Sequence, residues 1–246
     1  MNTVALITGG IGDIGTAIAK ELHESFNVVI ALDNADEAVG SAWQKAMYDE
    51  GFNHVHFKKM DVSNFDNCAK VVGDIVSQHG RVDVLVNNAG ITRDAIFSKM
   101  TKTQWDEVLR VNLDGMFNVT KQVVDVMRQH EYGRIVNVSS VNAQKGQFSQ
   151  ANYAAAKAGV YGFTKSIAQE LMSKNITVNS ISPGYVDTRL MKGIRADILE
   201  DIVQQIPAKR LAEPCEIAYV VSFLVNERSR YITGSNLSVN GGLHMY

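Results

Sequence analysis

Short apolar runs alternate with longer segments of helical periodicity along the whole chain. The runs are rich in β-branched residues, and their apolar positions are mostly continuous rather than alternating with polar ones. This continuity is typical of strands that are covered on both faces. The predicted strands are Val4–Thr8, Val28–Leu32, Val55–Met60, Val82–Val86, Ile135–Val138, Ile176–Ile181 and Asn236–Val239.

Helical spacing of apolar residues marks the segments between these runs, most clearly Ile14–Glu24, Trp105–Met127 and the Ala-rich Asn152–Ser173. Strands that alternate with helices imply βαβ units with right-handed crossovers. We therefore predict an α/β fold, with residues 1–246 forming a single dinucleotide-binding and catalytic domain of Rossmann type. Its doubly wound sheet has about seven parallel strands with helices on both faces. Segment 185–212 is helical in composition but falls between the last two strands, and we predict a helical insertion there that covers the substrate.

Composition and charge narrow the class of partner. The 246 residues include 24 Lys and Arg against 26 Asp and Glu, a net charge of −2. This balance argues against a broad surface for nucleic acid or anionic membrane, which needs clustered cations. No apolar run reaches the ~18 residues that a transmembrane helix needs, and the N-terminus lacks the features of a signal peptide. Cys68 and Cys215 fit no disulfide framework and no metal-ligand spacing. We expect a cytoplasmic protein with no metal site.

A glycine-rich turn follows the first strand and leads directly into a helix, at Thr8–Gly15. Its glycines are Gly9, Gly10, Gly12 and Gly15. Backbone N–H groups at a helix N-terminus bind phosphate when no Cβ blocks the approach. The strand–turn–helix context gives the Gly-x-Gly-x-x-Gly pattern much more weight than a lone match. The alternative is a tight turn without a ligand.

Asp33 ends the second strand, 18 positions after Gly15. A carboxylate at this place accepts hydrogen bonds from the adenosine ribose hydroxyls and repels a 2′-phosphate. No Arg or Lys lies between Ala31 and Ala42. NADH is therefore favoured, with NADPH as the alternative, and a loop-capping role for Asp33 stays open.

Tyr153 and Lys157 lie four residues apart, on one face of a predicted helix. A phenol titrates near ~10, and a cation one turn away favours its ionised form. The pair suits a general acid that protonates a carbonyl oxygen, although such a pair alone is common on solvated helices. Ser140 supports the assignment, because it closes the fifth strand at the edge where open α/β sheets bind ligands. Asn112 falls within a helical pattern, where a buried amide is costly unless it is hydrogen-bonded.

Together these motifs closely resemble the short-chain dehydrogenase/reductase family over essentially the whole chain. The resemblance rests on Thr8-Gly9 to Gly15, Asp61-Val62, Asn87-Asn88-Ala89-Gly90, Asn112, Ser140, Tyr153-x-x-x-Lys157 and Pro183-Gly184. It implies a homotetramer in which Tyr153 is the acid/base and Ser140 orients the substrate carbonyl. It further implies that Lys157 lowers the pKa of Tyr153 and holds the nicotinamide ribose, while Asn112 anchors a water on a proton relay.

The resemblance also implies a set of cofactor contacts along the carboxyl edge of the sheet. These residues are Gly9, Gly12, Asp13, Ile14, Gly15, Asp33, Asp61, Val62, Asn88, Ala89, Gly90, Tyr153, Lys157, Pro183, Gly184, Val186 and Thr188. One position departs from the family pattern, because Asp13 stands where the second loop glycine falls. A carboxylate near a pyrophosphate is unfavourable unless it turns outward or caps a helix.

The segments around the catalytic residues resemble the acetoacetyl-CoA reductases of polyhydroxyalkanoate synthesis. That resemblance implies reduction of a short 3-oxoacyl-CoA to the (R)-3-hydroxyacyl-CoA. Ser140, Gln147, Phe148, Gln150, Tyr153 and Tyr185 would contact this substrate. The alternatives are a 3-oxoacyl-acyl-carrier-protein reductase, a 3-hydroxybutyrate dehydrogenase and, outside enzymes, a dinucleotide-sensing binding module. For the glutamine-rich segment between Ser140 and Tyr153, the alternative is a solvated connection between strand and helix.

Overall fold

The computed structural model describes residues 3–245, and seven strands in this part of the chain form one parallel sheet. The sheet order is β3-β2-β1-β4-β5-β6-β7. The strands are β1 (Val4–Thr8), β2 (Val28–Asp33), β3 (Val55–Lys59), β4 (Val84–Asn87), β5 (Gly133–Val138), β6 (Ile176–Pro183) and β7 (Asn236–Val239). The chain reverses its direction of travel across the sheet between β1 and β4, which is the switch point where such sheets bind ligands. The predicted α/β fold is confirmed.

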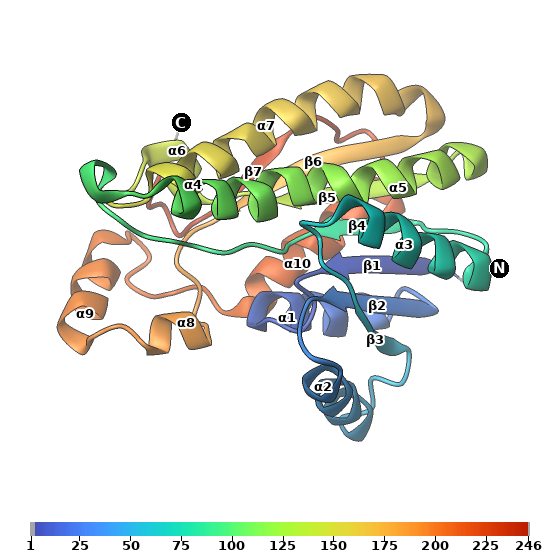
Figure 1. The fold of residues 1–246 in the computed structure, drawn as a ribbon, viewed down its shortest axis with the longest axis horizontal. Coiled ribbons are helices and arrows are strands. Elements are labelled where there is room, and N and C mark those ends of the chain that lie inside the picture. Colours follow the sequence, from blue (N-terminus) through green and yellow to red (C-terminus); the bar gives the residue numbers. More distant parts are fainter. Residues whose placement is uncertain (1–2, 246) are drawn as a thin grey trace.

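Helices cover both faces of this sheet (Figure 1). They are α1 (Asp13–His23), α2 (Glu37–Asp49), α3 (Phe65–His79), α4 (Lys102–Leu109), α5 (Gly115–His130), α6 (Val141–Lys145), α7 (Ala151–Leu171), α8 (Arg189–Lys192), α9 (Ala196–Gln205) and α10 (Pro214–Val225). Short 3₁₀ turns add Phe97–Lys99, Met172–Lys174 and Glu227–Ser229. Helices α1 and α10 pack together on one face, and α3, α5 and α7 cover the other.

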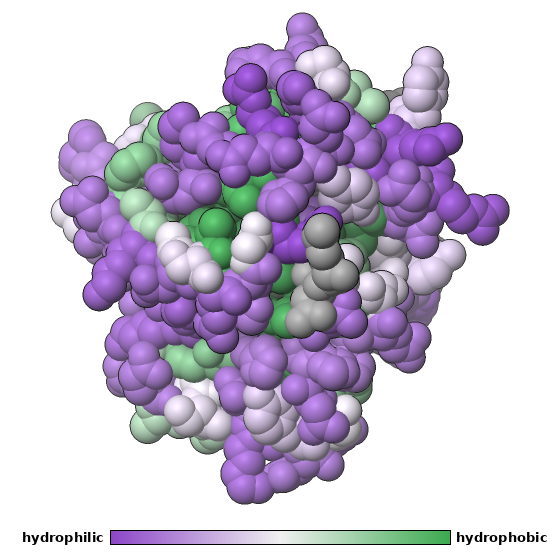
Figure 2. Space-filling view, turned by 90° about the vertical axis from the view of Figure 1, so that its right-hand side faces the viewer, coloured by the Kyte–Doolittle hydropathy of each residue, from purple (hydrophilic) through white to green (hydrophobic). Residues whose placement is uncertain are grey.

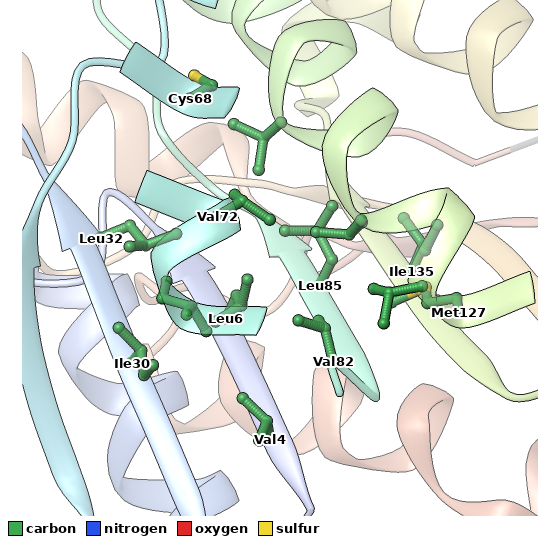
Figure 3. Packing of buried hydrophobic residues seen from close by; sticks show 14 of the residues in the cluster. Val4, Leu6, Ile30, Leu32, Cys68, Val72, Val82, Leu85, Met127 and Ile135 are labelled. Carbon is green, nitrogen blue, oxygen red and sulfur yellow. The ribbon is translucent and has the colours of Figure 1, made fainter. Parts of the chain in front are cut away.

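Two apolar cores lie on opposite faces of the sheet. The core beneath α3 and α5 joins Leu6, Ile30 and Leu85 of the strands to Val72 and Met127 of the helices (Figure 3). Alternate strand residues point to the other face and pack against α1 and α10. Each fully buried aliphatic side chain stabilises the fold by roughly 1.5–3 kcal/mol. Burial on both faces explains why the strand residues form continuous apolar runs.

Several strand ends differ by one or two residues from the sequence-based prediction, and one predicted helix is divided. Strand β4 begins at Val84 rather than Val82, and the Asp83 carboxylate just before it accepts the Val4 N–H at 2.8 Å. The predicted helix Trp105–Met127 is two helices, α4 and α5, joined by the π-helical turn Arg110–Asp114. Such turns are rare and often lie at functional sites.

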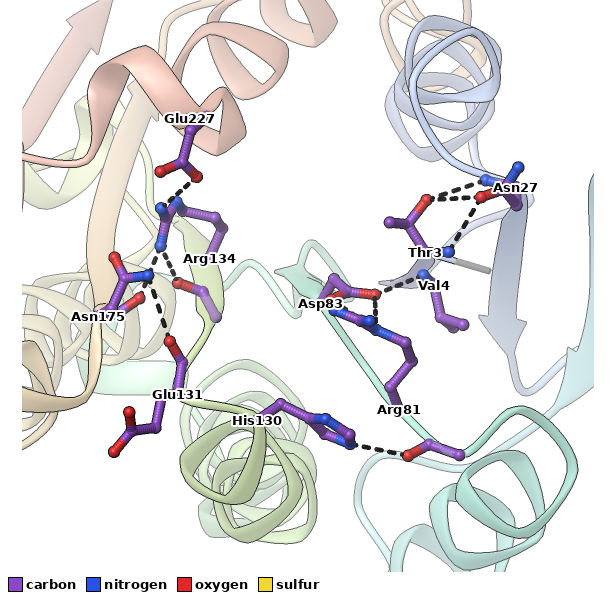
Figure 4. Close-up of polar contacts among 12 residues, drawn as sticks. Thr3, Val4, Asn27, Arg81, Asp83, His130, Glu131, Arg134, Asn175 and Glu227 are labelled. Carbon is purple, nitrogen blue, oxygen red and sulfur yellow. Dashed lines mark hydrogen bonds and ion pairs between the residues drawn. The ribbon is translucent and has the colours of Figure 1, made fainter. Parts of the chain in front are cut away.

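Polar side chains tie the elements together at the edge where the strands begin (Figure 4). Arg134 on β5 is fully buried. It donates to the Asn175 carbonyl at 2.8 Å and to the Glu227 carboxylate at 3.0 Å. The surface on the side where the N-terminus lies is largely hydrophilic, with small apolar areas between the polar side chains (Figure 2). This edge has a structural role, because charged groups there pair with one another or with backbone.

Segment 185–212 forms α8 and α9, which lie beside the main layers (Figure 1). Its two ends meet, because Val186 and Ala212 form a β-bridge and the Ala212 N–H donates to the Tyr185 carbonyl at 2.9 Å. The insertion is therefore closed at its base. Within residues 3–245, no helix has the length and apolar content to cross a membrane.

Candidate active site

The glycine-rich turn between β1 and α1 contains glycines of two kinds. A Cβ on Gly10 would lie 2.6 Å from the Ala31 backbone, and one on Gly15 would lie 2.2 Å from the Gly9 carbonyl. These glycines are needed for packing the turn itself. A Cβ on Gly12 would meet only the Gly9 carbonyl, at 3.4 Å. Gly12 therefore borders open space at the start of α1, and no side chain of the described residues caps this helix. The turn fits a phosphate group at Gly12 and the free N–H groups that follow it, including that of Ile14.

Asn88 and Thr8 fasten this turn to the end of β4. The Thr8 hydroxyl accepts the N–H groups of Asn88 and Ala89, both at 3.0 Å. The Asn88 amide donates to the carbonyls of Thr8 at 3.1 Å and Gly9 at 3.0 Å. The side chain of Asn88 thus shapes the turn, and its contact with a ribose stays a prediction.

Asp33 and Asp61 stand at the carboxyl ends of β2 and β3. Oδ1 of Asp33 accepts the Ala35 N–H at 3.1 Å, which is the loop-capping role foreseen as the alternative. The bond involves one carboxylate oxygen, so ribose binding by the other is compatible with it. Lys59 lies beside Asp33 in the sheet and its Nζ is 3.7 Å from Asp36. This cation comes from β3, outside the segment between Ala31 and Ala42 that contains no Arg or Lys.

Asp61 is held by its own loop. Its Oδ1 accepts the Ser63 N–H at 2.9 Å and the Ser63 hydroxyl at 2.8 Å. Val62, the next residue, is buried, and its carbonyl accepts the Asn118 amide at 2.8 Å. Both residues are fixed at the sheet edge, where the resemblance places the adenine.

The amide of Asn112 is fully buried in the π-helical turn. It exchanges two hydrogen bonds with Ile91, accepting its N–H at 2.8 Å and donating to its carbonyl at 2.9 Å. These bonds satisfy the buried amide, as its burial requires. A Cβ on Gly90 would lie 3.3 Å from Asn112 Oδ1 and 3.4 Å from Lys157 Nζ. Asn112 and Lys157 therefore flank Gly90 at the end of β4.

Tyr153, Ser140 and Lys157 come together where β5 ends and α7 begins. Ser140 is the N-cap of α6, and its hydroxyl lies beside the phenol of Tyr153, close enough to influence the pKa of that phenol. Lys157 is buried, and its Nζ donates to the Val138 carbonyl at 2.7 Å and lies 5.9 Å from the centre of the Tyr153 ring. The Ser139 hydroxyl donates to the Lys157 carbonyl at 2.7 Å, which fixes α7 against β5.

Burial governs the ionisation of both groups. Burial raises the pKa of Tyr153, the neighbouring Ser140 hydroxyl opposes this, and the negative charge of Asp94 adds to the increase. Burial lowers the pKa of Lys157 to about 8. The net effect on Tyr153 is upward, so the ligand-free site holds a protonated phenol rather than one whose pKa a nearby cation has lowered. A protonated phenol beside a hydroxyl can donate a proton to a carbonyl oxygen.

The loop between α6 and α7 is tied to the chain after β4. Gln150 accepts the Asn142 amide at 2.9 Å and donates to Asp94 at 2.9 Å, and the Asn142 N–H donates to the Ser140 hydroxyl at 3.1 Å. Gln147 accepts the Lys145 ammonium at 2.8 Å, and Phe148 is 79% exposed. Gln150 is therefore connected to Ser140, whereas Phe148 projects from the surface of the isolated chain.

The residues after β6 lie at the same edge of the sheet. The Gly184 N–H donates to the Val239 carbonyl at 2.9 Å, and Pro183 pairs with Val239 in the sheet. Val186 is buried, and Thr188 is the N-cap of α8. Tyr185 lines a cavity of about 210 Å³ together with Ile206, Ala208, Arg210, Ala212, Glu216 and residues 238–241. Neither Gln147 nor Phe148 lines this cavity.

Asp13 caps another helix instead of its own. Its carboxylate accepts the Arg189 backbone N–H at 2.6 Å and Arg189 Nε at 2.8 Å, and Arg189 is the first residue of α8. The carboxylate is thus paired with a cation beside the phosphate turn.

Comparisons with known proteins agree with this geometry. Residues 10–244 match the family model described as Enoyl-(Acyl carrier protein) reductase. The chain belongs to the short-chain dehydrogenase/reductase family.

Full-length relatives in this family carry the names of ketone reductases. The chain is 49% identical over 247 residues to the acetoacetyl-CoA reductase of Allochromatium vinosum, covering 100% of both chains. It is 47% identical over 242 residues to that of Cupriavidus necator, covering 98% of each. A 3-oxoacyl-(acyl-carrier-protein) reductase of Staphylococcus epidermidis is 39% identical over 250 residues, covering 100% of both.

Membership of the short-chain dehydrogenase/reductase family implies a nicotinamide cofactor, and the turn at Gly12 fits its phosphates. The sequence analysis identified the proposed catalytic residues but not Asp94 and Asn142, which connect to Ser140 through Gln150. Asp94 and Asn142 lie 56 and eight positions from Gln150, and no spacing rule relates residues at these separations.

Proposed function

We propose that this chain reduces a short 3-oxoacyl-CoA, acetoacetyl-CoA above all, to the (R)-3-hydroxyacyl-CoA. The observation that carries the proposal is the position of Tyr153 beside the Ser140 hydroxyl and the buried Lys157, whose Nζ lies 5.9 Å from the centre of the Tyr153 ring. The full-length relatives that share almost half of the sequence and are named acetoacetyl-CoA reductases support this substrate over others.

The nicotinamide cofactor supplies a hydride to C3 of the substrate when it is bound. The Ser140 hydroxyl orients the C3 carbonyl, and Tyr153 gives its phenolic proton to the carbonyl oxygen. The carbonyl carbon is thereby reduced to an alcohol while the reduced nicotinamide is oxidised. Lys157 holds the nicotinamide ribose, and Asn112 holds a water that leads a proton back to Tyr153.

Substrate contacts are proposed for the loop and the chain that surround this site. Gln150 is held in place by Asn142 and Asp94, so its amide is oriented before substrate arrives. Gln147, Phe148 and Tyr185 would contact the acyl group. Phe148 is exposed and Tyr185 lines a cavity that neither Gln147 nor Phe148 borders, so the assignment includes an inward movement of the loop or of segment 185–212 when substrate binds. Segment 185–212 would then cover the substrate.

NADH is proposed as the preferred cofactor, because the free oxygen of Asp33 suits ribose hydroxyls and repels a 2′-phosphate. The two cofactors are compared by their kcat/KM values with acetoacetyl-CoA. A higher value with NADH is expected, and Asp33→Ala should narrow the difference. Equal or higher kcat/KM with NADPH would overturn the assignment, and Lys59 would then be the first cation to replace.

We also propose that the chain acts as a cytoplasmic homotetramer. The stacked rings of Phe65 and Phe117, with centroids 6.3 Å apart, support association because both are exposed on neighbouring helices. Light scattering of the purified protein measures the mass, and a monomer would contradict the proposal.

A panel of four substrates tests the function. NADH oxidation is followed with acetoacetyl-CoA, acetoacetyl carrier protein, free acetoacetate and crotonyl-CoA. We expect the highest kcat/KM with acetoacetyl-CoA. Strong preference for the carrier protein would favour the fatty-acid reductase, and preference for the free acid would favour the hydroxybutyrate dehydrogenase. Turnover of crotonyl-CoA alone would indicate an enoyl reductase, and binding of NADH without turnover would indicate a sensing module.

A further inference from the structure

One ion pair joins the phosphate turn to the inserted segment. Asp13 is the first residue of α1 and Arg189 is the first residue of α8, 176 positions later. The Asp13 carboxylate accepts both the backbone N–H and Nε of Arg189, at 2.6 and 2.8 Å. A carboxylate that binds one residue through both its backbone and its side chain fixes the position of that residue.

Helix α8 is short and only partly buried. It has four residues, of which Met191 is buried while Leu190 is 72% exposed. The segment is closed at its base by the bridge between Val186 and Ala212. Beyond that base, the buried Met191 side chain and the two hydrogen bonds to Asp13 attach α8 to the rest of the fold.

The same ion pair compensates a negative charge at the glycine-rich turn. Asp13 follows Gly12 directly, at the helix N-terminus that fits the cofactor phosphates. An uncompensated carboxylate there would repel them, because two negative charges in a partly desolvated site interact strongly. The guanidinium of Arg189 removes most of that repulsion, and three quarters of the Arg189 side chain stays accessible to an incoming anion.

We propose that Asp13 and Arg189 are a positioning pair for the dinucleotide, an inference that rests on the proposed function. Arg189 masks the Asp13 charge so that the turn accepts a pyrophosphate, and Asp13 holds α8 beside that turn. An ordinary surface ion pair would contribute little to stability and nothing to binding. A positioning pair and an ordinary surface ion pair therefore predict different affinities for NADH when one or both residues are replaced.

The experiment compares Arg189→Ala, Asp13→Asn and the double variant by NADH titration without substrate. Arg189→Ala exposes the carboxylate and should raise the Kd for NADH by about tenfold. The double variant removes that charge too, and its Kd should return to within about twofold of the parent. Arg195→Ala is the matched control, because Arg195 is equally exposed in the same segment but pairs with Asp197. Its Kd should not change.

Limited thermolysin digestion without cofactor gives a second readout. Cleavage within residues 189–205 should be faster in all three variants than in the parent and in Arg195→Ala. Two results would overturn the inference: an unchanged Kd in Arg189→Ala, or a double variant that binds as weakly as the single one. Unchanged digestion would remove the tethering role. If the parent turns over acetoacetyl-CoA, such results refute this inference alone, whereas a parent that binds neither NADH nor NADPH refutes the proposed function.

Discussion

Replacing Gly12 by alanine should weaken dinucleotide binding without unfolding the protein. The new Cβ would lie 3.4 Å from the Gly9 carbonyl, an ordinary contact distance, and the Gly12 backbone (φ −67°, ψ 168°) suits any residue. Loss of glycine at an N-cap costs up to about 1 kcal/mol. Alanine also restricts the unfolded chain more than glycine does, which stabilises the folded protein by about 0.4–1 kcal/mol. Because these two effects oppose each other, the free energy of unfolding should change by less than about 1 kcal/mol.

Gly10→Ala is the matched control two positions earlier. Its Cβ would lie 2.6 Å from the Cα and Cβ of Ala31 and 2.9 Å from the Ile7 carbonyl. Backbone atoms on β1 and β2 would have to move, which costs about 1–3 kcal/mol or more.

Urea denaturation measures the free energy of unfolding of both variants, and NADH titration measures the Kd. For Gly12→Ala we expect parental stability and a Kd raised by about tenfold, equivalent to about 1.4 kcal/mol. For Gly10→Ala we expect a clear loss of stability. A Gly12→Ala protein that binds NADH as tightly as the parent would refute the assignment of this surface to the phosphates. A fully stable Gly10→Ala protein would refute the packing argument.

Two further predictions concern charge and burial. Burial lowers the pKa of Lys157 to about 8, so its ammonium is charged below that pH and neutral above it, whereas burial keeps Tyr153 protonated through the same range. The kcat/KM for reduction should therefore be constant below about pH 8 and decrease above it. In Lys157→Arg the decrease should begin at a higher pH, because the guanidinium stays charged. The same decrease at alkaline pH in both proteins would contradict this assignment. Glu227→Ala leaves the buried Arg134 guanidinium without its carboxylate and should cost about 3 kcal/mol. Arg134→Met removes the buried charge itself and leaves unpaired only the carbonyls and the half-exposed Glu227 carboxylate that it contacted. This variant should lose about 1–2 kcal/mol of unfolding free energy, measured by urea denaturation. The control Glu131→Ala replaces an exposed carboxylate and should not change the midpoint of urea denaturation. A larger loss of stability in Arg134→Met than in Glu227→Ala would contradict the reasoning.

Local pattern was enough to predict the sheet and most of the helices. Strands such as β1 and β6 are buried along their whole length, so their sequences show it directly. The π-helical turn at Arg110–Asp114 could not be predicted, because periodicity there is close to that of a normal helix. It surrounds Asn112, whose amide is bonded to Ile91, 21 residues away. A contact between distant segments therefore accompanies this local irregularity.

The residues of the proposed catalytic site could be located from sequence because helical spacing and strand ends fix them. Tyr153 and Lys157 share a helix face, and Ser140 follows the last residue of β5 by two positions. Partners that depend on long-range side-chain contacts were not predictable. Electrostatics required that Asp13 be paired or turned away, but only the structure identifies Arg189 as its partner. The sequence also could not predict that the pKa of Tyr153 is raised, because this shift depends on how much of the side chain is buried.

Single-turnover oxidation of NADH by Tyr153→Phe tests most directly whether this phenol donates the proton to acetoacetyl-CoA. The variant keeps the ring and removes the hydroxyl that lies beside Ser140. NADH should bind with a Kd within about twofold of the parent, since the hydroxyl belongs to the reaction rather than to the phosphate turn. The rate of the chemical step should fall by about 10²–10⁴-fold, the usual contribution of a general acid. A variant that binds NADH normally and oxidises it at the parental rate would contradict the proposed mechanism.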